Sequence, residues 1–86
     1  MPKNEKIAKI TARMCAENYD AVYQFGYELS GLVPGLTFSP QVVYNWSKGM
    51  KPRMTSLVAI IYAAQTCNKP HIEQWAKDVI AEITRD

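Results

Sequence analysis

The chain has 86 residues, of which 48% are hydrophobic and 21% are charged, and its formal net charge is +2. This length suffices for one hydrophobic core, so we expect residues 1–86 to form a single domain. The composition excludes a disordered chain, and the small positive charge permits a polyanionic partner without requiring one. Neither the two cysteines nor the single histidine has the ligand spacing of a zinc site, so we expect no metal.

The sequence offers no signal for export or for the membrane. The first residues, MPKNEKIAK, contain lysines but no apolar segment of a signal peptide. No apolar run approaches the roughly 20 residues that span a bilayer. We therefore expect a cytoplasmic protein without a membrane partner, in which Cys15 and Cys67 are small buried thiols.

Hydrophobic spacing predicts an all-α chain that begins with two amphipathic helices. The first extends from about Asn4 to Asn18. The second covers residues 21–32, and Asp20 before it is a preferred N-cap. Four cations of the first helix lie roughly on one face, which is either an ordinary solvated face or a surface for phosphate: Lys3, Lys6, Lys9 and Arg13.

Three further helices complete the expected compact five-helix bundle. Ser39 is a preferred N-cap and Pro40 suits the first helical position, so a third helix is predicted up to Gly49. A fourth helix, over about residues 55–66, is apolar on most sides and is expected to be the central core helix. Its predicted core residues are Leu57, Val58, Ile60, Ile61 and Ala64.

The fifth helix, over about residues 70–84, has an apolar stripe that is broad for so small a domain. One edge of this stripe is expected to pack on the fourth helix. The remainder favours a two-fold dimer interface formed by Ile72, Trp75, Val79 and Ile83. The alternative is a monomer in which Trp75 lies in its own core.

The third helix combines an apolar inner face with short polar side chains on its outer face. Val43 and Trp46 are three residues apart and can both point inward, whereas Gln41 and Asn45 project outward. Amides at this spacing suit paired hydrogen bonds to adenine, and Val42 suits contact with a thymine methyl group. The loop that follows offers backbone N–H groups and three cations suited to phosphate oxygens: Lys48, Lys51 and Arg53.

From Ser39 to Gly49 the chain resembles the lambda-repressor-like helix-turn-helix domains, which include phage Cro and repressor proteins and Xre-type bacterial regulators. The family pattern is a serine, three variable residues, a valine, two variable residues, a tryptophan or other apolar residue, two residues and a glycine, and it matches here without a gap. Residues 52–64 resemble the helix that follows in the family. Upstream, Phe25-Gly26 stands where the family has a Leu-Ala pair, and the connection SGLVPGLT is several residues longer.

The resemblance implies that helix 39–48 enters the major groove of double-stranded DNA. It places four residues at base-facing positions: Pro40, Gln41, Val42 and Asn45. The resemblance implies phosphate contacts for Ser39, Lys48, Lys51 and Arg53. We add two further phosphate contacts: Tyr44, which is expected at the surface, and Thr37, because the connection before the helix is longer.

The sequence therefore predicts a sequence-specific DNA-binding transcriptional regulator, a repressor of phage or bacterial type that binds an operator as a homodimer. We expect no enzyme, cofactor or small-molecule ligand, since the chain lacks paired carboxylates, a nucleophile beside a base and a glycine-rich phosphate loop. The alternative is a protein-interaction module on the same fold, such as an antitoxin, an adaptor or a phage assembly component. The position of the cations relative to Gln41 discriminates between the two.

Overall fold

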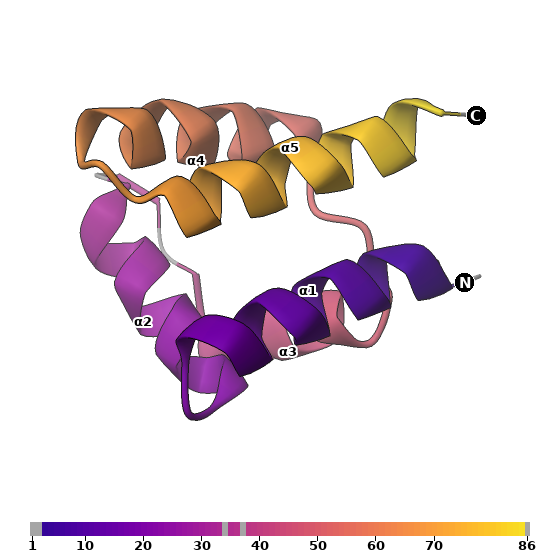
Figure 1. Ribbon diagram of the computed structural model, residues 1–86. Coiled ribbons are helices and arrows are strands. Elements are labelled where there is room, and N and C mark those ends of the chain that lie inside the picture. The colour runs from indigo at the N-terminus through magenta and orange to yellow at the C-terminus, as the bar shows by residue number, and fades with distance from the viewer. Residues whose placement is uncertain (1–2, 34, 37, 86) are drawn as a thin grey trace.

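The computed structural model describes residues 3–33, 35–36 and 38–85 (Figure 1). Its helices are α1 (Glu5–Asn18), α2 (Val22–Leu32), α3 (Pro40–Ser47), α4 (Met54–Thr66) and α5 (Pro70–Thr84). No strand occurs in these described ranges, so the predicted all-α class with five helices is confirmed. Within the same ranges, no helix combines the length and the apolar character needed to cross a bilayer.

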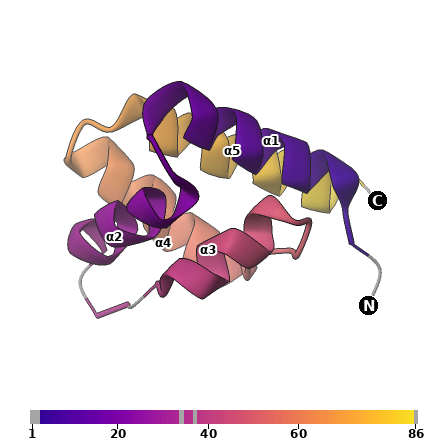
Figure 2. The ribbon, with the colours of Figure 1, turned by 90° about the horizontal axis from the view of Figure 1, so that it is seen from below.

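The helices form two layers (Figure 1). α4 and α5 lie side by side in one layer, and α1 and α3 lie in the other, with α2 at one end. α1 packs against both α5 and α3, and α2 packs against α3. The beginning of α1 and the α3–α4 loop lie at the same end of the bundle in both views (Figures 1 and 2).

Side chains that accept hydrogen bonds from free backbone N–H groups define two of the helix starts. Asn4 Oδ1 accepts from the N–H groups of Lys6 and Ile7, at 3.0 and 3.1 Å. Ser39 Oγ accepts from the N–H of Val42 at 3.2 Å, so the predicted N-cap of α3 is confirmed.

The predicted cap of α2 is wrong. Ala21, not Asp20, occupies the N-cap position. Gln24 reaches back from the first turn, and its Oε1 accepts from the N–H groups of Asp20 and Ala21, at 2.7 and 3.1 Å. The glutamine thereby satisfies donors just before the helix, and the side chain of Asp20 is exposed instead.

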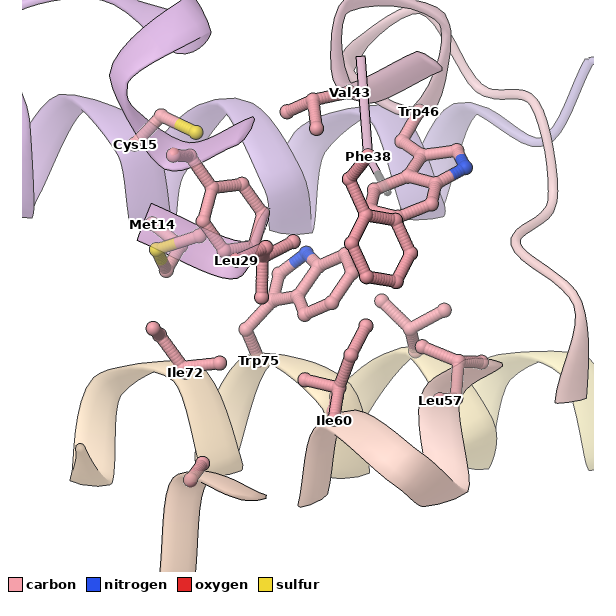
Figure 3. Packing of buried hydrophobic residues seen from close by; sticks show 14 of the residues in the cluster. Met14, Cys15, Leu29, Phe38, Val43, Trp46, Leu57, Ile60, Ile72 and Trp75 are labelled. Atoms are coloured by element: carbon pink, nitrogen blue, oxygen red, sulfur yellow. The ribbon is translucent and has the colours of Figure 1, made fainter. Parts of the chain in front are cut away.

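Four aromatic rings from different segments meet in the core, and Figure 3 labels three of them, Phe38, Trp46 and Trp75. Trp46 of α3 stacks on Trp75 of α5, with ring centroids 5.4 Å apart and an interplanar angle of 29°. Phe25 of α2 meets Trp75 edge to face at 4.9 Å, and Phe38 meets Trp46 in the same way at 5.7 Å. The indole Nε1 of Trp75 donates to the buried hydroxyl of Thr11 at 3.0 Å, which links α5 to α1.

The residues of the predicted dimer interface on α5 are covered within the chain itself, so this predicted interface is wrong. Ile72, Trp75 and Val79 are buried within this chain, and Ile83 is half-buried against the same core. Two helices cover the stripe: α1 packs on one side of α5, and α4 packs on another. Trp75 lies in the core of its own chain, as the alternative expected for this residue.

α4 is not the central core helix that its composition predicted. Leu57, Ile60 and Ala64 are fully buried, whereas the side chain of Val58 is 57% exposed and Ile61 is half-buried. A helix at the edge of a two-layer bundle has neighbours on only part of its circumference, so an apolar sequence does not ensure burial all round. Cys67, just beyond α4, is also exposed rather than buried, whereas Cys15 is buried as expected.

We predict that Thr11→Val lowers the free energy of unfolding by about 1–3 kcal/mol, because the Trp75 indole N–H would stay buried without an acceptor. Urea unfolding monitored by tryptophan fluorescence measures this. Thr11→Ser is the control: it keeps the hydroxyl and loses one methyl group, about 1 kcal/mol. A Thr11→Val variant as stable as the wild type would show that this hydrogen bond contributes nothing.

Candidate nucleic-acid interface

The inner face of α3 fixes the helix against α2. Val43 and Trp46 are buried, and Gly26 of α2 lies directly against Val43. A Cβ atom at Gly26 would stand 3.2 Å from the Cγ2 of Val43, so the two helices lie close together here and a side chain would require Val43 to shift by a few tenths of an ångström. This close approach determines which side chains of α3 point outward.

The long connection between α2 and α3 is hydrogen-bonded to α2 just before α3 begins. Ser30 Oγ donates to the carbonyl of Phe38 at 3.0 Å and accepts from the N–H of the same residue at 3.1 Å. Phe38 is buried against Trp46 immediately before the N-cap of α3. The start of α3 is therefore fixed despite the length of the connection. Thr37, a predicted contact, lies outside the described residues.

The outer face of α3 carries a pair of amides one turn apart. Gln41 Nε2 donates to Asn45 Oδ1 at 2.9 Å, and Gln41 is exposed while Asn45 is half-buried. This bond uses one amide hydrogen and one amide oxygen. Gln41 Oε1 can still accept and Asn45 Nδ2 can still donate, so the pair presents an acceptor and a donor to a partner.

The other predicted residues of α3 surround this pair. Val42 and Tyr44 are exposed and Pro40 is half-buried at the first position of the helix. The ammonium group of Lys48 lies 5.2 Å from the centre of the Tyr44 ring, an arrangement that favours a cation–π contact. Ser39 is exposed as well, although its hydroxyl is already used as the N-cap.

The α3–α4 loop is held against the start of α1. The N–H of Asn4 donates to the carbonyl of Gly49 at 2.9 Å, and Gly49 has a φ of +104°, in the left-handed region. The N–H of Met50 donates to the carbonyl of Asn45 at 3.0 Å. These bonds fix the backbone that carries the three exposed cations of the loop: Lys48, Lys51 and Arg53.

The four cations predicted to share one face at the start of the chain do not all gather at one place, and Lys9 is exposed without lining the hollow described next. Lys3 and Lys6 line the same surface hollow as Lys51, together with Asn4, Glu5 and Glu82. Arg13 lies further along α1, where its guanidinium is 3.9 Å from Glu17. The structure thus brings Lys3, which precedes α1, and Lys6, in its first turn, to the basic loop after α3, and it leaves Arg13 beside a carboxylate.

A second polar cluster joins residues that are far apart in the sequence. The hydroxyl of Tyr19 donates to the carboxylate of Glu28, and His71 Nε2 lies 3.0 Å from that hydroxyl and 3.3 Å from Glu28 Oε1. Lys69 Nζ is 3.7 Å from Glu28 Oε2. The cluster links α2 to the residues after α1 and to the start of α5. No local pattern in the sequence indicated it, because its members share no helix.

Burial alone would raise the pKa of Glu28. The hydrogen bonds from Tyr19 and His71, together with the charge of Lys69, outweigh it and hold the pKa of this carboxyl below its ordinary value. Desolvation and the neighbouring Glu28 raise the pKa of the Tyr19 phenol. Glu28 is therefore the charged acceptor of the cluster at neutral pH.

Comparison of the chain with protein-family models, with curated proteins and with solved structures finds no match. The site described above is a surface rather than a cleft: one helix face with two amides, an exposed tyrosine and a set of cations at its C-terminal end. Such a surface can donate and accept hydrogen bonds and attract anions.

We predict that Gly49→Ala destabilises the fold by about 2–4 kcal/mol, because alanine is strained at this φ and its Cβ would lie 2.9 Å from the carbonyl oxygen of Asn4. Gly35→Ala is the matched control, since Gly35 has a φ of +82° but no atom within 4 Å of an added Cβ. Thermal unfolding compares the two. Equal losses would show that the contact with Asn4 is unimportant.

We also predict that Glu28→Gln lowers the free energy of unfolding at pH 7 by about 1 kcal/mol, because charge-assisted hydrogen bonds are lost. The pKa of Glu28 is depressed in the folded state, so the stabilisation is fully present above the ordinary carboxyl pKa and is lost as the pH falls through the folded value. Urea unfolding between pH 7 and pH 3 should show wild type and variant converging in acid. A constant difference would contradict this account.

Proposed function

We propose that this protein binds double-stranded DNA by placing the outer face of α3 in the major groove, and that it regulates transcription, as a repressor, by occupying an operator. The observation that carries the proposal is the division of α3 into two faces. Val43 and Trp46 fix the inner face in the core, while the hydrogen-bonded pair Gln41 and Asn45 projects from the outer face. The cytoplasm is where we place this activity.

The dimensions and chemistry of α3 support this proposal. The major groove is about 12 Å wide and admits an α-helix. Adenine presents there an acceptor, N7, and a donor, the N6 amino group. The free oxygen of Gln41 can accept from N6, and the free amide nitrogen of Asn45 can donate to N7. The exposed Val42 lies on the adjacent side of the helix, where a thymine methyl group would contact it.

The distribution of charge supports the same proposal. Lys48, Lys51 and Arg53 follow α3 directly, and the hollow beside Lys51 also contains Lys3 and Lys6, together with the carboxylates of Glu5 and Glu82. Although the net charge of the chain is only +2, several of its cations lie at the C-terminal end of the proposed DNA-facing helix. Phosphate contacts at that end would set the register of α3 in the groove without reading sequence.

The protein-interaction alternative is favoured by a different surface, the exposed apolar face of α4, which includes Val58. That face belongs to α4, whereas Gln41 and Asn45 belong to α3, so the two surfaces share no residue. A contact with protein there is compatible with DNA binding through α3.

We predict that binding to random duplex DNA weakens steeply as salt increases, because phosphate contacts release counterions. The double substitution Lys51→Ala/Arg53→Ala should reduce the slope of log K against log salt by about 2, since each lost phosphate contact removes about 0.9. Fluorescence anisotropy over a salt series measures the slope. Gln41→Ala/Asn45→Ala should leave this non-specific binding unchanged and abolish preference for a selected site.

The control is Arg13→Ala/Lys77→Ala, which removes the same charge from α1 and α5 away from the loop. Both residues are exposed and lie beside carboxylates of their own helix. If this variant flattens the salt slope as much as the loop variant does, the loop is not the phosphate-contacting surface. If the wild type binds no DNA even at low salt, the proposed function is wrong.

A further inference from the structure

The hydroxyl of Ser30 forms two hydrogen bonds to the residue just before the N-cap of α3. It donates to the carbonyl of Phe38 at 3.0 Å and accepts from the N–H of the same residue at 3.1 Å. A serine hydroxyl has one hydrogen to donate, and this contact uses it. Phe38 lies outside any helix, so one side chain of α2 pairs both polar groups of a backbone unit that has no helical partner.

The backbone of α2 also passes close to the same segment. A Cβ atom at Gly26 would stand 3.5 Å from the carbonyl oxygen of Phe38 and 3.5 Å from the Cα atom of Pro40, which are ordinary van der Waals distances. Gly26 and Ser30 are four residues apart, so they lie one turn apart on the same face of α2. This face therefore holds the chain at the start of α3 by close packing at one turn and by hydrogen bonds at the next.

The two ends of α3 are held by different interactions. After its C-terminal end, the N–H of Met50 donates to the carbonyl of Asn45 at 3.0 Å, and the N–H of Asn4 donates to the carbonyl of Gly49 at 2.9 Å. Neither of these bonds involves α2. Loss of the Ser30 hydrogen bonds would therefore loosen the start of α3 and leave the basic loop after it in place.

Gln41 is the predicted base-contacting amide that lies closer to this start. It is the second residue of α3 and follows Phe38 by three residues, whereas Asn45 lies one turn further along. A shift of the backbone at Phe38 would thus displace Gln41 more than it displaces the loop cations. Hydrogen bonds to bases weaken steeply when their geometry changes, whereas phosphate contacts are independent of sequence.

We propose that Ser30 is a specificity-determining residue: through its two hydrogen bonds to the backbone of Phe38, it positions Gln41 for contact with bases. The proposal rests on the proposed binding of DNA by α3. Ser30 is a positioning residue, which acts through Phe38 and touches no base itself. A long connection leaves the start of a helix more freedom than a short turn does, and these two bonds remove that freedom.

Amide hydrogen exchange of the free protein tests the positioning step without DNA. In Ser30→Ala, the amides of Phe38 and Val42 should exchange about tenfold faster, and the amide of Met50 should exchange as in the wild type. Faster exchange at Met50 as well would indicate a general loss of stability instead of a local one. Circular dichroism should show that the variant is folded, since alanine favours a helix more than serine does.

Thr66→Ala is the matched control for the loss of a hydroxyl group. Thr66 also donates its hydroxyl to a backbone carbonyl, that of Tyr62, at 3.0 Å, but the bond lies within α4. This variant should leave the exchange of the Phe38 and Val42 amides unchanged.

The functional step is tested by the ratio of two affinities, for a site selected with the wild type and for random duplex DNA. Ser30→Ala should lower this ratio about tenfold, the effect of losing one base-specific pair of hydrogen bonds. Its affinity for random duplex and the salt slope should stay as in the wild type, because the loop cations keep their place. Ser30→Thr keeps the hydroxyl and should retain most of the ratio. Fluorescence anisotropy measures both affinities.

Four outcomes would overturn the proposal. Two concern Ser30→Ala alone: unchanged exchange at Phe38, and faster exchange there with unchanged discrimination. The third is an equal loss of affinity for both duplexes, and the fourth is a Ser30→Thr variant that loses discrimination as Ser30→Ala does. A wild type that binds no DNA would instead contradict the proposed function, and the exchange measurement would still decide whether Ser30 fixes the start of α3.

Discussion

The stacked indoles of Trp46 and Trp75 are the contact on which the orientation of α3 depends. The backbone of α3 packs against α1 and α2, and the side chain of Trp46 reaches across to the ring of Trp75 on α5. Trp75 is in turn fixed by Phe25 and by its hydrogen bond to Thr11. A rotation of α3 about its axis would break the stack, so its outer face has one orientation on the domain.

The same constraint explains why residues from separate parts of the sequence form one surface around α3. Because α3 is fixed, the loop after it has a defined path, and the bond between Asn4 and Gly49 attaches that loop to the start of α1. Lysines from two distant parts of the sequence, Lys3 and Lys51, thereby line one hollow, in which the lysines outnumber the carboxylates of Glu5 and Glu82. A protein with little net charge can still present a locally basic edge when its fold gathers cations in this way.

Local signals predicted much of the fold and part of the candidate site. The cap at Ser39 and the inward face of Val43 follow from interactions within a few residues, which a sequence displays directly. Burial of Trp75 and exposure of Val58 do not, because periodicity shows which side of a helix is apolar but not which neighbour covers it. The cluster around Glu28 also escaped prediction, since its partners come together only in the folded chain.

The central claim is that the outer face of α3 and the loop after it contact DNA. The most direct test is to follow the backbone amide signals of the full chain by NMR while duplex DNA is added. The account predicts that the largest shifts occur from Ser39 to Arg53, with smaller shifts at Lys3 and Lys6 and little change at Val58. Shifts confined to α4, or no shifts at low salt, would contradict it.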